Sequence, residues 1–151
     1  MTKYFMLSNT NDAYINVFRD CIVDTTRQTG YYLPEEFEAY LAILLGSFLD
    51  KPDFLPEHSF AKAYMSVHEN KNMTAKQLAD VCLFVVGVFP NIGSKHNISH
   101  NYYKNIGISS YDIVSKDFNS NLFGMLRDHF DLATRIISIS TRPPPVNIRV
   151  I

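Results

Sequence analysis

The chain has 151 residues, a hydrophobic fraction of 46% and a charged fraction of 19%, which fit one folded domain and exclude a disordered chain. Its 14 basic and 15 acidic side chains give a formal net charge of −1, so no overall charge draws it toward nucleic acid or an anionic membrane. The longest apolar run, Val81 to Phe89, is about half of the roughly 20 residues that span a bilayer.

Two features of the sequence indicate a cytoplasmic protein. The N-terminal segment MTKYFMLSNTND lacks the apolar stretch of a secretory signal. The two cysteines, Cys21 and Cys82, are too few for a disulfide framework, and each lies among apolar residues. This pattern favours free thiols in a reducing compartment over a disulfide bridge.

Helical periodicity runs through the chain, and no segment shows the sustained alternation of a β-strand. Six helices are predicted, over residues 12–28, 34–49, 57–69, 75–89, about 99–114 and about 120–137. In the first of these the apolar residues on one side are Tyr14, Val17, Phe18, Cys21 and Ile22, and Gly30 is the predicted stop. Either Asn119 or Ser120 is the expected N-cap of the last.

Residues 75–89 form the predicted centre of the fold. Thr74 and Gln77 have the spacing of a capping box, and Pro90 ends the helix. Almost every side chain between these limits is apolar, so neighbouring helices are expected to enclose this one on all sides. Gly107, inside the next helix, either breaks that helix or lets another helix approach closely, and we favour close packing.

The fold class that follows is all-α: a single-domain bundle of about six helices over residues 1–140. Residues 141–151 form a separate Pro-rich segment. Three consecutive prolines, Pro143 to Pro145, exclude a helix there and favour an extended tail.

Short sequence pieces spread over residues 33–115 carry a resemblance to a known family. They are Leu33-Pro34-Glu35, Ala39-Tyr40-Leu41, Leu44-Leu45, Phe60 to Tyr64, Leu78 to Phe84, Gly87 to Pro90, Tyr102-Tyr103, Gly107 and Ser110-Tyr111. Together these pieces resemble a group of uncharacterised, mostly proteobacterial, helical proteins. The resemblance implies an all-helical bacterial protein and carries over no catalytic residue, because the group has no assigned activity.

Asp80 is the most informative polar residue, because it lies within the apolar helix 75–89. A carboxylate in such a place must be paired or hydrogen-bonded, or it takes up a proton. One interpretation is a ligand-binding or catalytic carboxylate in a pocket, facing His96, His100 or Tyr103. The favoured one is a structural latch to an arginine, a tyrosine hydroxyl or a helix N-terminus.

Metal, nucleophilic and phosphate chemistry find no support in the sequence. His96 and His100 have the spacing of two metal ligands on a helix, but Ser99 is the expected N-cap between them, so we predict no metal site. Cys82 lies in a buried helix, where a thiol is unreactive. No glycine-rich phosphate loop occurs. We therefore expect no cofactor and favour a non-catalytic protein.

The segment Gly93 to Tyr111 offers an alternative function. It contains Lys95, Lys104 and three tyrosines, among them Tyr103 and Tyr111. Aromatic rings interleaved with cations stack on bases and hold phosphates. Two lysines are few for such a surface, and tyrosines at helical spacing more often belong to a core.

The favoured function is a protein-interaction or regulatory module. The chain holds nine tyrosines and eleven phenylalanines, and its apolar ends, Tyr4 to Met6 and Pro143 to Ile151, are suited to docking on another subunit. A protein partner or self-association as a homodimer is therefore predicted, with no membrane partner.

Overall fold

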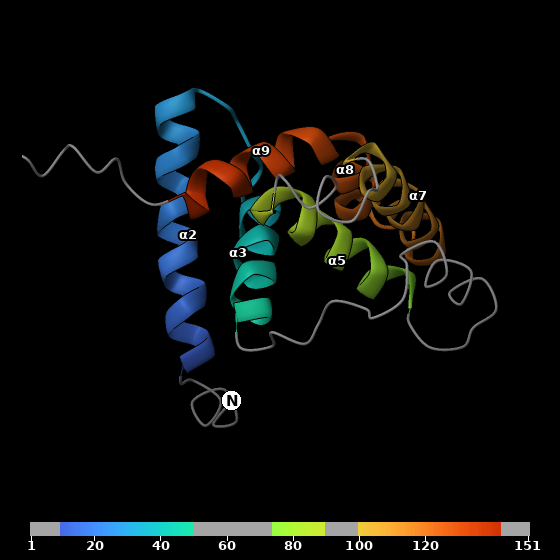
Figure 1. The fold of residues 1–151 in the computed structure, drawn as a ribbon, viewed down its shortest axis with the longest axis horizontal. Coiled ribbons are helices and arrows are strands. Elements are labelled where there is room, and N and C mark those ends of the chain that lie inside the picture. Colours follow the sequence, from blue (N-terminus) through green and yellow to red (C-terminus); the bar gives the residue numbers. More distant parts are fainter. Residues whose placement is uncertain (1–9, 50–73, 90–99, 143–151) are drawn as a thin grey trace, which may run out of the picture.

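The computed structural model describes residues 10–49, 74–89 and 100–142. These residues form six helices and no strand (Figure 1), which confirms the predicted all-α bundle. The predicted helix over 57–69 and the Pro143–Ile151 tail lie outside the described residues. The helices are α2 (Thr10–Thr29), α3 (Glu35–Leu49), α5 (Ala75–Val88), α7 (His100–Phe118), α8 (Asn121–Asp128) and α9 (Phe130–Thr141).

Local capping chemistry sets the helix ends as predicted at two places. At the start of α5 the Thr74 hydroxyl accepts the Gln77 N–H at 3.1 Å, and the Gln77 Oε1 accepts the Thr74 N–H at 2.9 Å. This is the predicted capping box. At the end of α2, Gly30 has φ +80°, a conformation that glycine adopts without a steric penalty.

The predicted helix over about 120–137 is wrong in one respect, because it is two helices. Ser120 is the N-cap of α8, and its hydroxyl accepts the Phe123 N–H at 3.4 Å. His129, with φ −117° and ψ 33°, separates α8 from α9. Leu126 and Phe130 are buried on either side of this break. The spacing of apolar residues therefore continues across the break. This spacing predicts which side of a helix faces the core, but it does not predict whether the helix is continuous.

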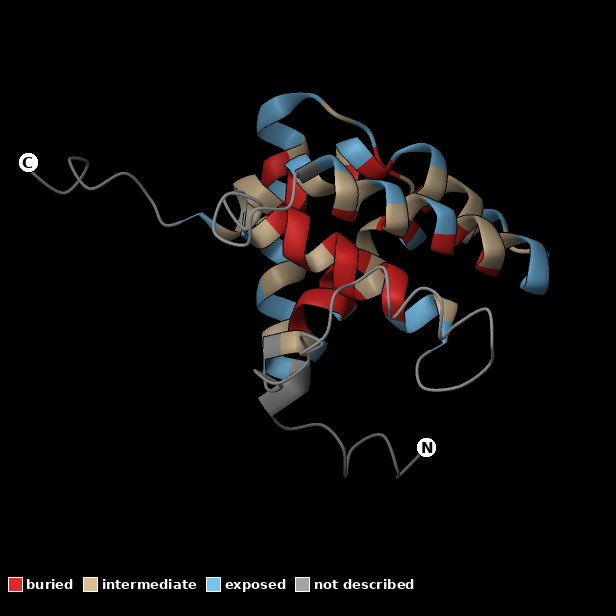
Figure 2. Ribbon diagram, turned by 45° about the vertical axis from the view of Figure 1, so that its right-hand side comes forward, coloured by how far each residue is buried: buried red, intermediate tan, exposed pale blue. Residues whose placement is uncertain are grey.

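Helix α5 lies at the centre of the bundle and packs mainly against α7 and α9. Its buried residues are Leu78, Ala79, Val81, Cys82, Leu83, Val85, Val86 and Gly87. Figure 2 shows the buried residues gathered in the middle of the molecule and the exposed ones at its periphery.

The prediction that the central helix is enclosed on every side needs a correction. One stripe of α5, at steps of four residues, reaches the surface: Lys76 is exposed, and Asp80, Phe84 and Val88 are half-buried. Residues four apart lie on the same side of a helix. Asp80 thus lies at the edge of the core.

Helix α2 packs against α3 and α9. The Thr25 and Ser140 hydroxyls are hydrogen-bonded at 2.8 Å, which joins α2 to the last described helix. The apolar side predicted for α2 is partly wrong, because Val17 is 56% exposed. The side that packs on the core carries Ile15, Phe18 and Ile22.

Gly107 allows helices to pack closely, as predicted. An ideal Cβ added there would lie 2.7 Å from the Phe130 ring and 3.0 Å from the Cys82 Cβ. The first distance is too short for a Cβ contact and the second is unusually tight, so the absence of a Cβ lets α7 lie close to α5 and to the first residue of α9.

Candidate functional site at Asp80

The Asp80 carboxylate joins three helices. Its Oδ1 accepts the Tyr40 hydroxyl of α3 at 2.6 Å and the Tyr111 hydroxyl of α7 at 2.7 Å. Its Oδ2 lies 3.0 Å from the Lys76 Nζ, one turn earlier on α5. A tyrosine hydroxyl was one of the expected latch partners, and the structure supplies two of them.

Helix α8 covers the two tyrosine rings through Phe123. The Phe123 ring meets the Tyr40 ring edge-on, with centroids 5.6 Å apart, and stacks on the Tyr111 ring with centroids 6.1 Å apart. Aromatic contacts of this kind restrict ring orientation and add to the energy of burial. The two hydroxyls are therefore held in place by packing as well as by their common acceptor.

The electrostatics of the site keep both tyrosines protonated. Burial raises the pKa of Tyr40 well above its usual value, and the negative charge of Asp80 raises it further. The pKa of Tyr111 is raised by the same two causes in the same order. At neutral pH each hydroxyl is thus a dependable donor, and both donate to the same carboxylate oxygen.

The two carboxylate oxygens of Asp80 have different surroundings. Oδ1 bonds to the two tyrosines inside the bundle. Oδ2 bonds to the Lys76 side chain at the surface. The Lys76 side chain is 48% exposed, and the Asp80 side chain is 13% exposed. The Lys76 Nζ also lies 5.4 Å from the centroid of the Tyr40 ring, within the range of a cation–π interaction.

The structure places only some of the predicted site residues together. Tyr111 contacts Asp80, whereas Tyr103 lies roughly two turns earlier on α7 and is buried, 3% exposed. The pKa of Tyr103 is raised by burial and then by Tyr102 and Cys82 rather than by Asp80. His96 lies outside the described residues, and His100 begins α7 with a side chain that is likewise not described.

Sequence reasoning missed two residues of the site. Lys76 carries a readable signal, because it lies four residues before Asp80 on a predicted helix, where opposite charges pair. Tyr40 carries no such signal, since it is 40 residues away on another helix.

Other chemistry at the centre of the bundle is limited by burial. Burial raises the pKa of the Cys82 thiol, which keeps it in the unreactive protonated form. Among residues 10–49, 74–89 and 100–142, no group of three or more His, Cys, Asp or Glu side chains is placed to hold a metal ion.

Two tyrosines and one lysine of the segment Gly93 to Tyr111, which was considered for nucleic-acid binding, are not available for that role. Tyr103 and Tyr111 are 3% and 0% exposed, so their rings are not accessible for stacking on bases. The Lys104 Nζ lies 2.9 Å from the Asp131 Oδ2, which neutralises that cation. Residues 90–99 of this surface are outside the described part of the chain.

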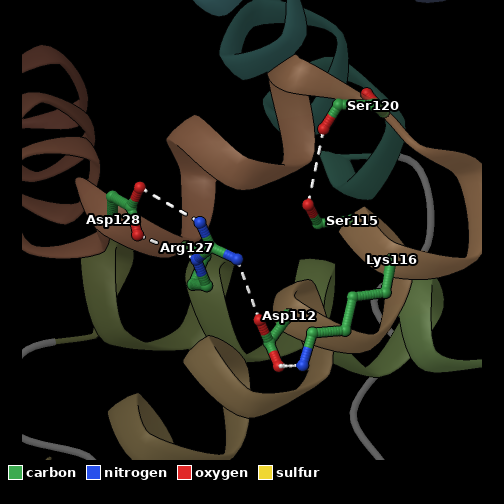
Figure 3. Close-up of polar contacts among 6 residues, drawn as sticks. All are labelled: Asp112, Ser115, Lys116, Ser120, Arg127 and Asp128. Carbon is green, nitrogen blue, oxygen red and sulfur yellow. Dashed lines mark hydrogen bonds and ion pairs between the residues drawn. The ribbon is translucent and has the colours of Figure 1, made fainter.

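An ion-pair cluster at the surface holds α8 against α7 (Figure 3). Arg127 Nη1 bonds to Asp112 Oδ1 at 2.8 Å, and Lys116 Nζ lies 3.1 Å from Asp112 Oδ2. Asp128 accepts Arg127 Nε at 2.8 Å. The hydrogen bonds from Arg127 and Lys116 hold the pKa of Asp112 below its usual value. The Arg127–Asp112 bond links α7 to α8, the helix whose Phe123 covers the two tyrosines.

Comparisons with known proteins give no relative for this chain. A scan against protein-family models, a search of the curated proteins and a search of the solved structures each found no match. The resemblance to proteobacterial helical proteins therefore stays a prediction. In the described part of the chain, every helix is too short or too polar to cross a lipid bilayer.

Proposed function

We propose that the protein is a non-catalytic interaction module of the bacterial cytoplasm, and that it associates with a second copy of itself through one side of α2. This side, the α2 flank, is formed by Tyr14, Val17 and Cys21. The observation that carries the proposal is the 56% exposure of Val17 between half-buried Tyr14 and Cys21. These residues are spaced by three and four positions and therefore form one apolar stripe.

Two further features support a non-catalytic role in a reducing compartment. The carboxylate of Asp80, the strongest candidate for a catalytic acid, is bound by Tyr40, Tyr111 and Lys76 of its own chain. Cys21 and Cys82 are both free thiols, as is usual in the cytoplasm.

Light scattering of the intact chain at high micromolar concentration tests the proposal. We expect a dimer, and we expect Val17→Asp to give a monomer, because a charge in an apolar interface is left unpaired. Ser47→Asp, which places the same charge at an exposed position of α3, is the control and should leave the dimer intact. A monomeric intact chain would contradict self-association.

Cross-linking locates the interface. Cys21 lies on the α2 flank, whereas Cys82 is buried. A short bismaleimide should therefore join two copies of the chain through Cys21, and Cys21→Ser should abolish the cross-linked product. A dimer that forms normally but shows no Cys21 cross-link would place the interface on another surface.

A further inference from the structure

We infer that Asp80 and Tyr40 form a receptor for an organic ammonium group, and that the side chain of Lys76 occupies this receptor in the free protein. The inference is independent of the proposed self-association, because it concerns the stripe of α5 and not the α2 flank. The ligand class is a primary alkylammonium ion, whether from a free amine or from a lysine side chain of another protein.

The carboxylate of this receptor is preorganised. Its Oδ1 is held by two hydroxyls at 2.6 and 2.7 Å, and these come from two different helices. Phe123 packs on both tyrosine rings and restricts them. If Lys76 moves away, Asp80 cannot follow it without breaking both hydrogen bonds. The Oδ2 atom then stays in position, so a ligand does not have to order the carboxylate when it binds.

The surroundings of the Lys76 Nζ are those of an ammonium-binding site. A carboxylate oxygen lies 3.0 Å from the nitrogen, and the Tyr40 ring centroid lies 5.4 Å from it. A negative charge and an aromatic face acting on one cation are the elements by which proteins recognise ammonium ligands. Lys76 itself shows that an ammonium group fits between them.

The occupant is easily displaced. Lys76 is 48% exposed and reaches Asp80 from one turn earlier on the same helix. Surface pairs of this spacing are weak, so competition from Lys76 should lower the apparent affinity of a ligand only about two- to threefold.

Titration of the full chain with n-butylammonium chloride, followed by NMR of the Asp80 carboxylate carbon, tests the inference. Lys76→Met keeps the apolar stem but empties the site. We expect this variant to show a saturable shift at Asp80 and to bind about two- to threefold more tightly than the wild-type protein. Butanol, which has the same alkyl chain without the charge, should produce no such shift.

A matched variant separates this site from an ordinary ion pair. Lys116 also pairs with an aspartate four residues away, Asp112, at 3.1 Å. Lys116→Met should therefore bind n-butylammonium no better than the wild-type protein. The inference is overturned if Lys76→Met shows no saturable shift at Asp80, if potassium chloride gives the same shift, or if Lys116→Met gains as much affinity.

A second ligand distinguishes the two sources of the ammonium group. The peptide acetyl-Ala-Lys-Ala-amide presents a lysine side chain as a partner protein would. Binding of this peptide more tightly than n-butylammonium supports recognition of a protein lysine, and equal or weaker binding supports a free amine. A failure of the light-scattering test would leave both titrations unaffected, so the two proposals stand or fall separately.

Discussion

The hydroxyl of Tyr40 lies 2.6 Å from the carboxylate of Asp80, although 40 residues separate them in the chain. Tyr111 donates to the same oxygen from a third helix, at 2.7 Å. The Asp80 Oδ1, on α5, therefore accepts hydrogen bonds from both α3 and α7. Because both donors are buried or half-buried, we expect this three-helix contact to make a large polar contribution to stability.

Replacing Asp80 with alanine should lower the free energy of unfolding by about 2–4 kcal/mol, because it leaves two tyrosine hydroxyls inside the bundle without their acceptor. Urea denaturation followed by circular dichroism measures the effect. Lys76→Met is the control, and it should cost less than about 1 kcal/mol, because it removes a half-exposed ion pair and a cation–π contact at the surface. An Asp80→Ala protein that unfolds at the same urea concentration as the wild-type protein would show that the carboxylate is not a latch.

High pH should unfold the protein through Tyr40 and Tyr111. In the unfolded chain both side chains ionise near the ordinary tyrosine pKa of about 10. In the folded chain the pKa of both residues is raised, first by burial and then by Asp80. The folded state therefore retains protons that the unfolded state releases above about pH 10. The stability linked to these two groups is complete below that pH and is lost as the pH rises further.

Tyrosinate absorbance and circular dichroism recorded together across this pH range measure the transition. Part of the tyrosinate signal should appear only as helicity is lost. Tyr111→Phe should reduce that part of the signal. If every tyrosine ionised near its ordinary pKa of about 10 with full retention of helicity, the expected coupling would not exist.

Two glycines within helices should respond oppositely to alanine. Gly107→Ala should destabilise the protein by about 1–2 kcal/mol, because crowding against the Phe130 ring outweighs the gain in helix propensity. Gly124→Ala is the matched substitution in α8, where the nearest atom to an added Cβ, the Ser115 Oγ, is 3.4 Å away. It should stabilise the protein by about 0.5–1 kcal/mol. Thermal unfolding of both variants checks this, and equal shifts would contradict the close packing at Gly107.

Ser110→Ala should stabilise the protein. In the described part of the chain the Ser110 Oγ is a buried atom without a hydrogen-bond partner, which is unfavourable. The neighbouring Ser109 is exposed, so Ser109→Ala is a control that gains helix propensity alone. We expect Ser110→Ala to exceed this control by about 1 kcal/mol in denaturant unfolding. A Ser110→Ala protein less stable than the control would show that the hydroxyl makes a favourable interaction.

Much of the fold could be predicted from local sequence. The capping box at Thr74 and Gln77 and the stop at Gly30 depend on neighbouring residues only, and both are present. The break at His129 could not be predicted in this way. No proline or glycine marks it, and Leu126 and Phe130 keep the spacing of an unbroken helix.

The candidate site shows where sequence reasoning ends. A lone carboxylate in an apolar helix indicates that Asp80 needs a partner, because an unpaired charge is costly there. It does not indicate which partner, since Tyr40 and Tyr111 approach from helices that are distant in the sequence. The partly exposed stripe of α5 was missed for a related reason. Phe84 and Val88 are as apolar as their buried neighbours, so composition alone cannot tell which side of the helix lacks a complete cover.

The hydrogen bond between Thr25 and Ser140 spans 115 positions of the chain. During synthesis α2 leaves the ribosome long before α9, its packing partner at that contact. The part of α2 around Thr25 that packs against α9 is therefore covered only after α9 has been translated. We expect nascent chains that stop before α9 to expose this surface and to be recognised by chaperones, whereas a chain that includes α9 covers it.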